Sequence, residues 1–134
     1  MIIKIPKNVL NEMINYIYIN KPNEAVCFLL GFINNDVYNV KELVKAKNAA
    51  NSPAEFNVEP DELLNIYKRA EEKGLDIVAI VHSHHGLPIP STTDIKYMKL
   101  NPYVWIIISM TDLKMQAFIL KEEKVDPVKI MIVD

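Results

Sequence analysis

The sequence lacks the features that mark secreted and membrane-spanning proteins. Cys27 is the only cysteine, so a disulfide within the chain is impossible and a reducing compartment, the cytosol, is expected. The strongly apolar runs, such as Ile77–Val81 and Val104–Ile108, are far shorter than the roughly 20 residues that a membrane-spanning helix needs. The opening residues MIIKIPKN carry no pattern of a secretory signal, so we expect Met1 to begin the mature chain.

The sequence also lacks an excess of charge of either sign. Its 15 lysines and arginines nearly balance its 17 aspartates and glutamates, for a net charge of −2. Nucleic acids and anionic membranes are bound by a surplus of basic residues on one face, so we expect neither as a partner. Half of the residues are apolar, and 134 residues suffice for one core, so we expect a single globular domain over residues 1–134.

The hydrophobic periodicity predicts a mixed α/β architecture. A helix is expected from Pro6 to about Pro22, and a second from Pro60 to Gly74, with Leu63, Leu64 and Tyr67 along one face. The other expected elements are a hairpin of Ala25–Ile33 and Val37–Lys47, a central strand at Leu75–Val81 buried on both faces, a short helix from Ser91 to about Leu100, and strands at Tyr103–Met110, Lys114–Lys121 and Val128–Val133. The order αββαβαβββ predicts a mixed β-sheet flanked by helices.

All three histidines of the chain lie together just after the predicted central strand. Side chains at positions i and i+2 of a strand point to the same side, so His82 and His84 can present two imidazoles to one point. Two imidazoles and one carboxylate, with a fourth position for water, make a catalytic zinc site. Asp94 is the nearest acid downstream, so His82, His84 and Asp94 are the candidate metal ligands.

Each of these motifs also has a purely structural interpretation. Paired histidines at a strand end can be polar caps on a sheet edge. Ser91-Thr92-Thr93-Asp94 has the pattern of a helix capping box, with Ser91 as the N-cap and Asp94 reaching back to it. The combination of two imidazoles, a hydroxyl and a carboxylate around one loop nevertheless favours a site.

The same motifs resemble a known family. His82-Ser83-His84 followed by Pro90-Ser91-Thr92-Thr93-Asp94 is similar to the HxH and SxxD signature of the JAMM, or MPN-plus, zinc metalloproteases, which remove ubiquitin-like modifiers from proteins. That family has an upstream glutamate in a pattern like E-x-x-G-x-L-x-G, and EAVCFLLG, from Glu24 to Gly31, stands at that place. The resemblance covers essentially the whole chain and implies the JAMM/MPN, or cytidine-deaminase-like, fold.

The resemblance implies a role for each site residue. His82, His84 and Asp94 would hold one zinc ion per chain, with a water completing the tetrahedron. Glu24 would be the general acid/base that takes a proton from this water and gives it to the departing amine. The Ser91 hydroxyl would donate to the tetrahedral intermediate. Apart from the resemblance, Glu24 follows Pro22-Asn23 and is typical of a solvated acid at the start of a strand.

Three departures from the family pattern bear on the site. Six residues, His85 to Pro90, separate His84 from Ser91, one fewer than the family typically has, so the reach of Asp94 depends on how this loop adjusts. His85 replaces a proline, and we expect it to be exposed, with a role as a ligand or ligand support as the alternative. Cys27 replaces a glycine, and we expect a buried core residue, with a thiol ligand or redox switch as the alternative.

The sequence therefore predicts a compact, prokaryotic-type zinc metalloprotease. It would use metal-activated water to hydrolyse the amide or isopeptide bond at the C-terminus of a ubiquitin-like or small sulfur-carrier protein. The alternative is a catalytically inactive scaffold or protein-interaction module of the same fold, although such members usually lose a ligand and every candidate ligand type is present here.

Overall fold

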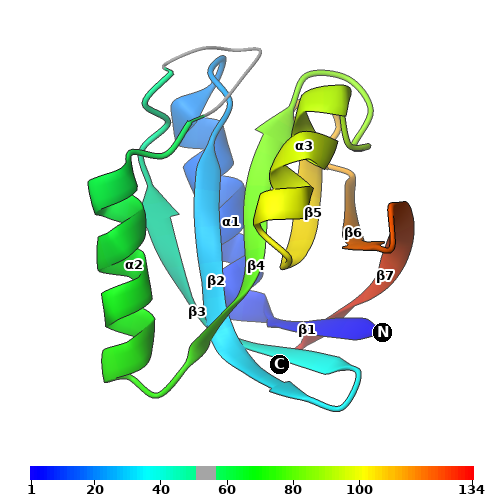
Figure 1. The fold of residues 1–134 in the computed structure, drawn as a ribbon. Helices are drawn as coiled ribbons and strands as arrows, with labels where there is room; N and C mark the ends of the chain where they lie inside the picture. Colours follow the sequence, from blue (N-terminus) through cyan, green and yellow to red (C-terminus); the bar gives the residue numbers. More distant parts are fainter. Residues whose placement is uncertain (51–56) are drawn as a thin grey trace.

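A computed structural model describes residues 1–50 and 57–134 of the chain (Figure 1). The elements of these residues are β1 (Ile2–Pro6), α1 (Lys7–Asn20), β2 (Val26–Asn34), β3 (Val37–Ala46), α2 (Pro60–Glu72), β4 (Asp76–His84), α3 (Thr92–Leu100), β5 (Val104–Ser109), β6 (Met115–Lys121) and β7 (Lys124–Val133). The predicted mixed sheet flanked by helices is confirmed, with one strand added at its beginning. No helix in the described ranges is long and apolar enough to cross a membrane.

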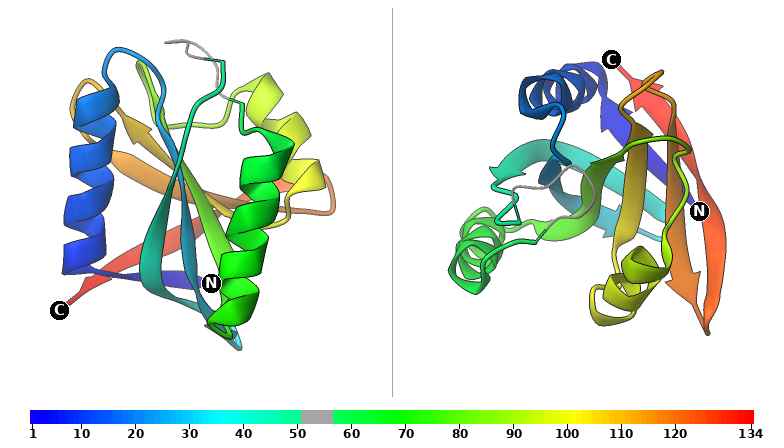
Figure 2. Two further views of the ribbon diagram at one scale, coloured as in Figure 1. Left: turned by 90° about the vertical axis from the view of Figure 1, so that its left-hand side faces the viewer. Right: turned by 90° about the horizontal axis from the view of Figure 1, so that it is seen from above.

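The strands form one sheet that closes on itself in the order β1-β3-β2-β4-β5-β6-β7. β4 is antiparallel to β2 and parallel to β5, and β1 completes the closure by running parallel to both β3 and β7. Figure 2 shows α1 on one face of this sheet and α2 and α3 on the other. The end of β4 therefore lies between α1 on one side and α2 and α3 on the other.

The core is divided into two clusters because β4 and its neighbours are apolar on both faces. Val81 and Ile106 pack with residues of α1, whereas Ile80 and Trp105 pack with residues of α2 and α3. Burial on both faces is the reason that these strands read as continuous apolar runs rather than alternating ones. Strand β4 is paired with β2 and β5 along its two edges and is buried on both faces, which fixes the position of the residues at its end.

The strand β1 was missed by the sequence prediction. Ile3 and Ile5 are fully buried and alternate with partly exposed neighbours, as in a strand with one face in the core. The strand is only five residues long and ends at Pro6, where the periodicity already indicated a helix. Its partners β3 and β7 are distant in the sequence, so no local pattern could reveal the pairing.

Two further expectations need correction. Strand β7 begins at Lys124 rather than Val128, because Glu122 and Glu123 adopt φ values of 48° and 69° and form a tight two-residue turn. Of the apolar face predicted for α2, only Leu63 packs against the core, while Leu64 and Tyr67 are 51% and 42% exposed. Ile66 and Ala70, which are one helical turn apart, form the buried stripe instead.

Candidate metal centre

The candidate site lies at the carboxyl end of β4, which includes both histidines of the predicted pair. His82 is completely buried and His84 is partly exposed, and both project from the same side of the strand. Ser83 faces the other way, where its Oγ accepts a hydrogen bond of 2.8 Å from the Ala25 N–H. The Ser83 N–H in turn donates to the Ala25 carbonyl at 3.1 Å. This double link continues the β2–β4 pairing and brings Glu24 beside the histidines.

Asp94 is positioned by the first turn of α3. The Asp94 N–H donates to Ser91 Oγ at 3.1 Å, and the Ser91 N–H donates to Asp94 Oδ2 at 2.8 Å, so the predicted capping box is confirmed. The same carboxylate reaches the histidines: Oδ1 lies 3.5 Å from His82 Nε2, and Oδ2 lies 3.0 Å from His84 Nε2. The loop of six residues is therefore long enough to bring Asp94 to both imidazoles.

Two of these separations can be compared with those expected of ligands around one small cation. Zinc binds imidazole nitrogen and carboxylate oxygen at about 2.0–2.2 Å, so neighbouring ligand atoms of a tetrahedral site are about 3.3–3.6 Å apart. The distances of 3.0 and 3.5 Å from the Asp94 oxygens to the two Nε2 atoms are close to this edge length. Two imidazoles and a carboxylate are a donor set that zinc accepts, and these residues are close enough together to bind one metal ion.

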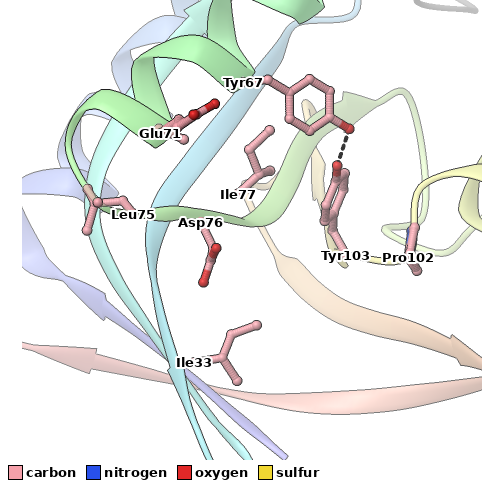
Figure 3. A pocket seen from close by; sticks show the side chains of 10 residues that line it. Ile33, Tyr67, Glu71, Leu75, Asp76, Ile77, Pro102 and Tyr103 are labelled. Atoms are coloured by element: carbon pink, nitrogen blue, oxygen red, sulfur yellow. Dashed lines mark hydrogen bonds between the residues drawn. The ribbon is translucent and has the colours of Figure 1, made fainter.

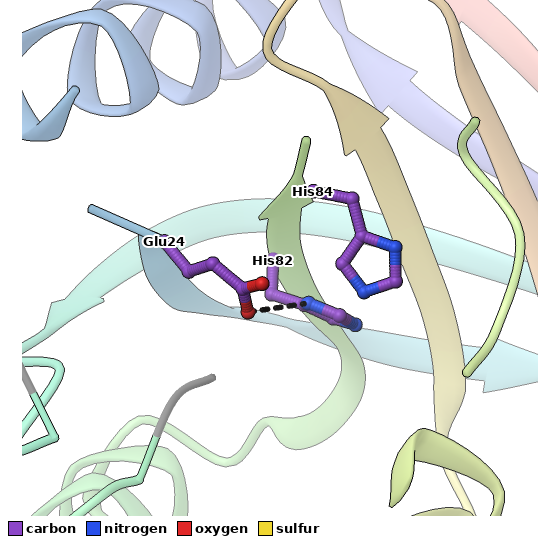
Figure 4. A group of neighbouring side chains, drawn as sticks. All are labelled: Glu24, His82 and His84. Carbon is purple, nitrogen blue, oxygen red and sulfur yellow. Dashed lines mark ion pairs between the residues drawn. The ribbon is translucent and has the colours of Figure 1, made fainter. Parts of the chain in front are cut away.

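Glu24 lies on the other side of His82. One possible ligand atom from each of Glu24, His82 and His84 lies within 4.8 Å of the other two (Figure 4). Oε1 of the Glu24 carboxylate lies 3.9 Å from Nδ1 of His82. Glu24 is only 5% exposed, so the interpretation of this residue as a solvated acid is wrong. The two nitrogens of His82 thus face two different carboxylates.

The environment sets the protonation of these groups. Burial lowers the pKa of His82 to about 4, although the Asp94 carboxylate opposes this shift. His82 is therefore neutral at pH 7, which is the form that binds metal. Burial is the largest single influence on Asp94 and His84 as well and works against their charged forms, but the hydrogen bond between them and the nearby opposite charges together outweigh it, so the pKa of Asp94 is lowered and that of His84 is raised. Asp94 is therefore a carboxylate at pH 7, and His84 must give up any proton it holds before it can bind a metal ion.

Asn48 is a site-supporting residue that the sequence did not reveal. Its Nδ2 donates to the Glu24 carbonyl at 2.9 Å, while its Oδ1 accepts from the N–H groups of Ala50 and Asn57, both at 3.0 Å. One amide side chain therefore connects the main chain at Glu24 to the main chain at Ala50 and at Asn57. A single asparagine in a polar segment carries no motif, so only the fold identifies it.

The two residues that depart from the family pattern do not enter the histidine and carboxylate group. His85 is exposed, as expected, and its Nε2–H donates to the Pro22 carbonyl at 2.9 Å, which ties the β4–α3 loop to the segment before Glu24. Cys27 is 2% exposed and packs in the α1-side cluster, which confirms the core interpretation. Burial raises the pKa of its thiol to about 12, so the thiolate that could bind metal does not form near neutrality.

Comparisons with known proteins agree with this arrangement. Residues 6–120 match the family described as prokaryotic homologs of the JAB domain. The chain is 34% identical over 130 residues to the desampylase of Pyrococcus furiosus. The aligned residues make up 96% of this chain and 89% of that protein. Its fold is similar to the solution structure of protein DSY2949 from Desulfitobacterium hafniense, with a TM-score of 0.87 and 27% identity over 100% of this chain and 94% of that one. The chain therefore belongs to the JAB-domain, or JAMM, family as a compact prokaryotic member and a JAMM-type hydrolase.

Proposed function

We propose that this protein is a zinc-dependent isopeptidase that releases a ubiquitin-like modifier by hydrolysing the amide bond at the modifier's C-terminus. The convergence of His82, His84, Asp94 and Glu24 at the end of β4 carries this proposal. The similarity to a desampylase, an enzyme named for removing the ubiquitin-like modifier SAMP, supports this class of substrate. A small sulfur-carrier protein is the second substrate that the sequence predicts.

In this proposal His82, His84 and Asp94 hold the metal ion. The capping box fixes the Asp94 carboxylate, and the strand fixes both imidazoles, so the three donors need little rearrangement to bind. When bound, zinc lowers the pKa of a coordinated water to about 7 and polarises a carbonyl oxygen. This leaves Glu24, on the Nδ1 side of His82, for proton transfer.

Glu24 has the position and environment of a general acid/base. Its carboxylate is buried beside the histidines, and its main chain is held by the pairing of Ala25 with Ser83 and by Asn48. In the reaction, a Glu24 oxygen accepts a proton from the attacking water and then delivers it to the nitrogen of the leaving amine. A fixed carboxylate suits both steps because it does not have to be reoriented between them.

Ser91 can cap the helix and take part in the reaction at the same time. In the capping box the hydroxyl oxygen accepts a hydrogen bond from the Asp94 N–H, which uses a lone pair and not the hydroxyl hydrogen. That hydrogen can therefore be donated to the oxygen that becomes negatively charged in the tetrahedral intermediate. The two roles would compete only if both needed the hydroxyl hydrogen. Here the cap uses the oxygen, so the two roles are compatible.

The proposal is tested by cleavage of an isopeptide-linked conjugate. The native protein loaded with zinc should release a SAMP-type modifier from a lysine side chain, and a sulfur-carrier fusion assayed in parallel decides between the two substrates. Glu24→Gln should retain zinc and lose turnover, because it keeps the shape of the side chain but cannot accept the proton. Asp76→Asn, at the exposed beginning of β4, is the matched control and should cleave normally.

Two results would contradict the proposal. An unchanged cleavage rate in Glu24→Gln would exclude the acid/base role of this residue. A native protein that binds zinc but cleaves neither conjugate would favour the scaffold or interaction module instead.

A further inference from the structure

An apolar pocket lies between α2 and α3, close to the candidate metal centre. Its volume is about 290 Å³. Its floor is formed by Phe28 of β2, Ile80 of β4 and Trp105 of β5, all of which belong to the core cluster on this face of the sheet. We call it the α2–α3 pocket. Such a volume is at the lower end for small-molecule sites and is suited to one large side chain rather than to a folded element.

The floor of this pocket is continuous with the metal centre. Ile80 lies two residues before His82 on β4, so the two side chains project from the same face of the strand. The Trp105 ring packs edge-on against the His82 ring, with 5.8 Å between their centroids. Its Nε1–H donates to the Asn101 carbonyl at 3.0 Å, which fixes the orientation of the indole. A group bound in the pocket is therefore held at a defined distance from the metal ligands.

The α3 side of the pocket is connected to the site by the helix itself. Tyr97 lies three residues after Asp94, so both are on adjoining positions of one helix face. Tyr97 and Leu100 line the pocket, and they are 38% and 76% exposed. Apolar surface of this kind gains stability when a ligand covers it.

The chemistry of the lining selects the kind of occupant. None of the described residues that line the pocket is charged; Val58 and Leu63 complete its apolar walls. Asn57 and Asn101 are the polar residues of the lining, and Nδ2 of Asn101 donates to the Tyr97 carbonyl at 3.0 Å. The lining thus matches an uncharged aliphatic side chain.

A larger hollow, of about 660 Å³, lies elsewhere (Figure 3). Tyr67 and Tyr103 line it and are joined by a hydrogen bond between their hydroxyls, and Glu71 and Asp76 add carboxylates. It surrounds the beginning of β4, whereas His82 and His84 are at the end of that strand. It is therefore badly placed for a group that must also reach the metal centre.

We propose that the α2–α3 pocket binds an aliphatic side chain of the substrate's C-terminal tail, close to the bond that is cleaved, and so selects the tail sequence. This inference rests on the proposed function, because the occupant is part of the polypeptide substrate. The pocket should bind a residue of the size of leucine at this position of the tail, and it should bind small or acidic residues more weakly.

The proposal can be tested without measuring catalysis, because Trp105 is the only tryptophan in the chain and its fluorescence reports on the pocket floor. Zinc-loaded protein is titrated with N-acetyl-Leu-Gly, N-acetyl-Ala-Gly and N-acetyl-Asp-Gly. We expect a saturable change with the leucine peptide, at a concentration at least about tenfold lower than with the alanine peptide, since one missing methylene in an aliphatic pocket already costs about tenfold or more and alanine lacks several carbons of leucine. The aspartate peptide should give no saturable change.

Two exposed leucines provide matched variants. Leu100→Ala removes part of the pocket wall and should weaken binding of the leucine peptide about fivefold to tenfold. Leu64→Ala, at a 51% exposed position of α2 outside the pocket lining, should bind like the native protein. Both positions are exposed enough that the fold should tolerate the change.

The outcomes separate this inference from the proposed function. Equal binding of the leucine and alanine peptides, or an equal effect of the two leucine variants, would overturn the pocket assignment. A change in Trp105 fluorescence with protein concentration alone would also overturn it, because a second copy of the chain would then fill the pocket. Leucine-selective binding without cleavage of any conjugate would support the pocket and count against the isopeptidase activity only.

Discussion

Replacing Ser91 separates its two roles, because the cap depends on the hydroxyl oxygen and the reaction on the hydroxyl hydrogen. Ser91→Gly removes the hydroxyl, but glycine at an N-cap costs a helix only a few tenths of a kcal/mol, whereas alanine costs about 1 kcal/mol. Ser91→Thr retains both functions. The three variants therefore form a series in which helix stability and hydrogen-bond donation change independently.

The loss of the donor should be much larger than the loss of the cap. Removing one donor to a developing oxyanion lowers kcat by roughly 10²–10³ in enzymes where this has been measured, which corresponds to about 2.7–4 kcal/mol. A destabilisation of about 1 kcal/mol is small beside the 5–15 kcal/mol that holds a typical domain folded. A hundredfold decrease in kcat at 25 °C in either variant therefore cannot come from unfolding.

The assay combines three measurements on each variant. Conjugate cleavage gives kcat and KM, thermal unfolding gives the stability of the whole fold, and elemental analysis gives zinc per chain. Ser91→Gly should retain zinc and nearly native stability and lose kcat by about 10²-fold or more. If Ser91→Gly cleaves within a fewfold of the native rate, the donor role of the hydroxyl is refuted and the cap is its only role.

Three further changes test other parts of the structure. Gly31→Ala should destabilise the fold by about 3 kcal/mol in denaturant unfolding, because a Cβ at this position would lie 1.8 Å from the Asn39 carbonyl oxygen. Gly74→Ala is the comparison: it has open space around the added Cβ but a φ of +66°, and it should cost only about 1 kcal/mol. Cys27 should resist iodoacetamide in the native protein up to about pH 10 and react after unfolding, since its pKa is raised to about 12; rapid native alkylation would contradict its burial. Removing the metal with a chelator should lower the unfolding temperature, by the equivalent of about 2.7 kcal/mol when free zinc had been at 100 times its Kd, and an Asp94→Ala variant should show no such shift.

The sequence predicted the site more completely than it predicted the sheet. His82 and His84 were recognisable because the apolar run before them defined the strand, and the period of two placed both imidazoles on one side. Asp94 was recognisable because the capping pattern located the start of α3. The meeting of these residues follows from local elements and one short loop, which is the kind of structure that local patterns describe.

The missing parts depend on contacts between distant segments. β1 is stabilised by β3 and by β7 at the far end of the chain, and its own five residues do not identify it. The burial of Glu24 follows from the pairing of Ala25 with Ser83, so its local surroundings of proline and asparagine pointed to an exposed acid instead. Asn48 acts through two segments at once, and its residue type gives no signal of this.

Zinc content per chain tests the metal centre most directly. The native protein, Asp94→Ala and Glu24→Gln are purified without added metal, reconstituted with zinc, and measured by elemental mass spectrometry. Ligation by His82, His84 and Asp94 predicts about one zinc per chain in the native protein and in Glu24→Gln, and a clear loss in Asp94→Ala. Retention of zinc by Asp94→Ala with its loss from Glu24→Gln would show that Glu24 is the carboxylate ligand, and an absence of zinc from the native protein would contradict a metal centre altogether.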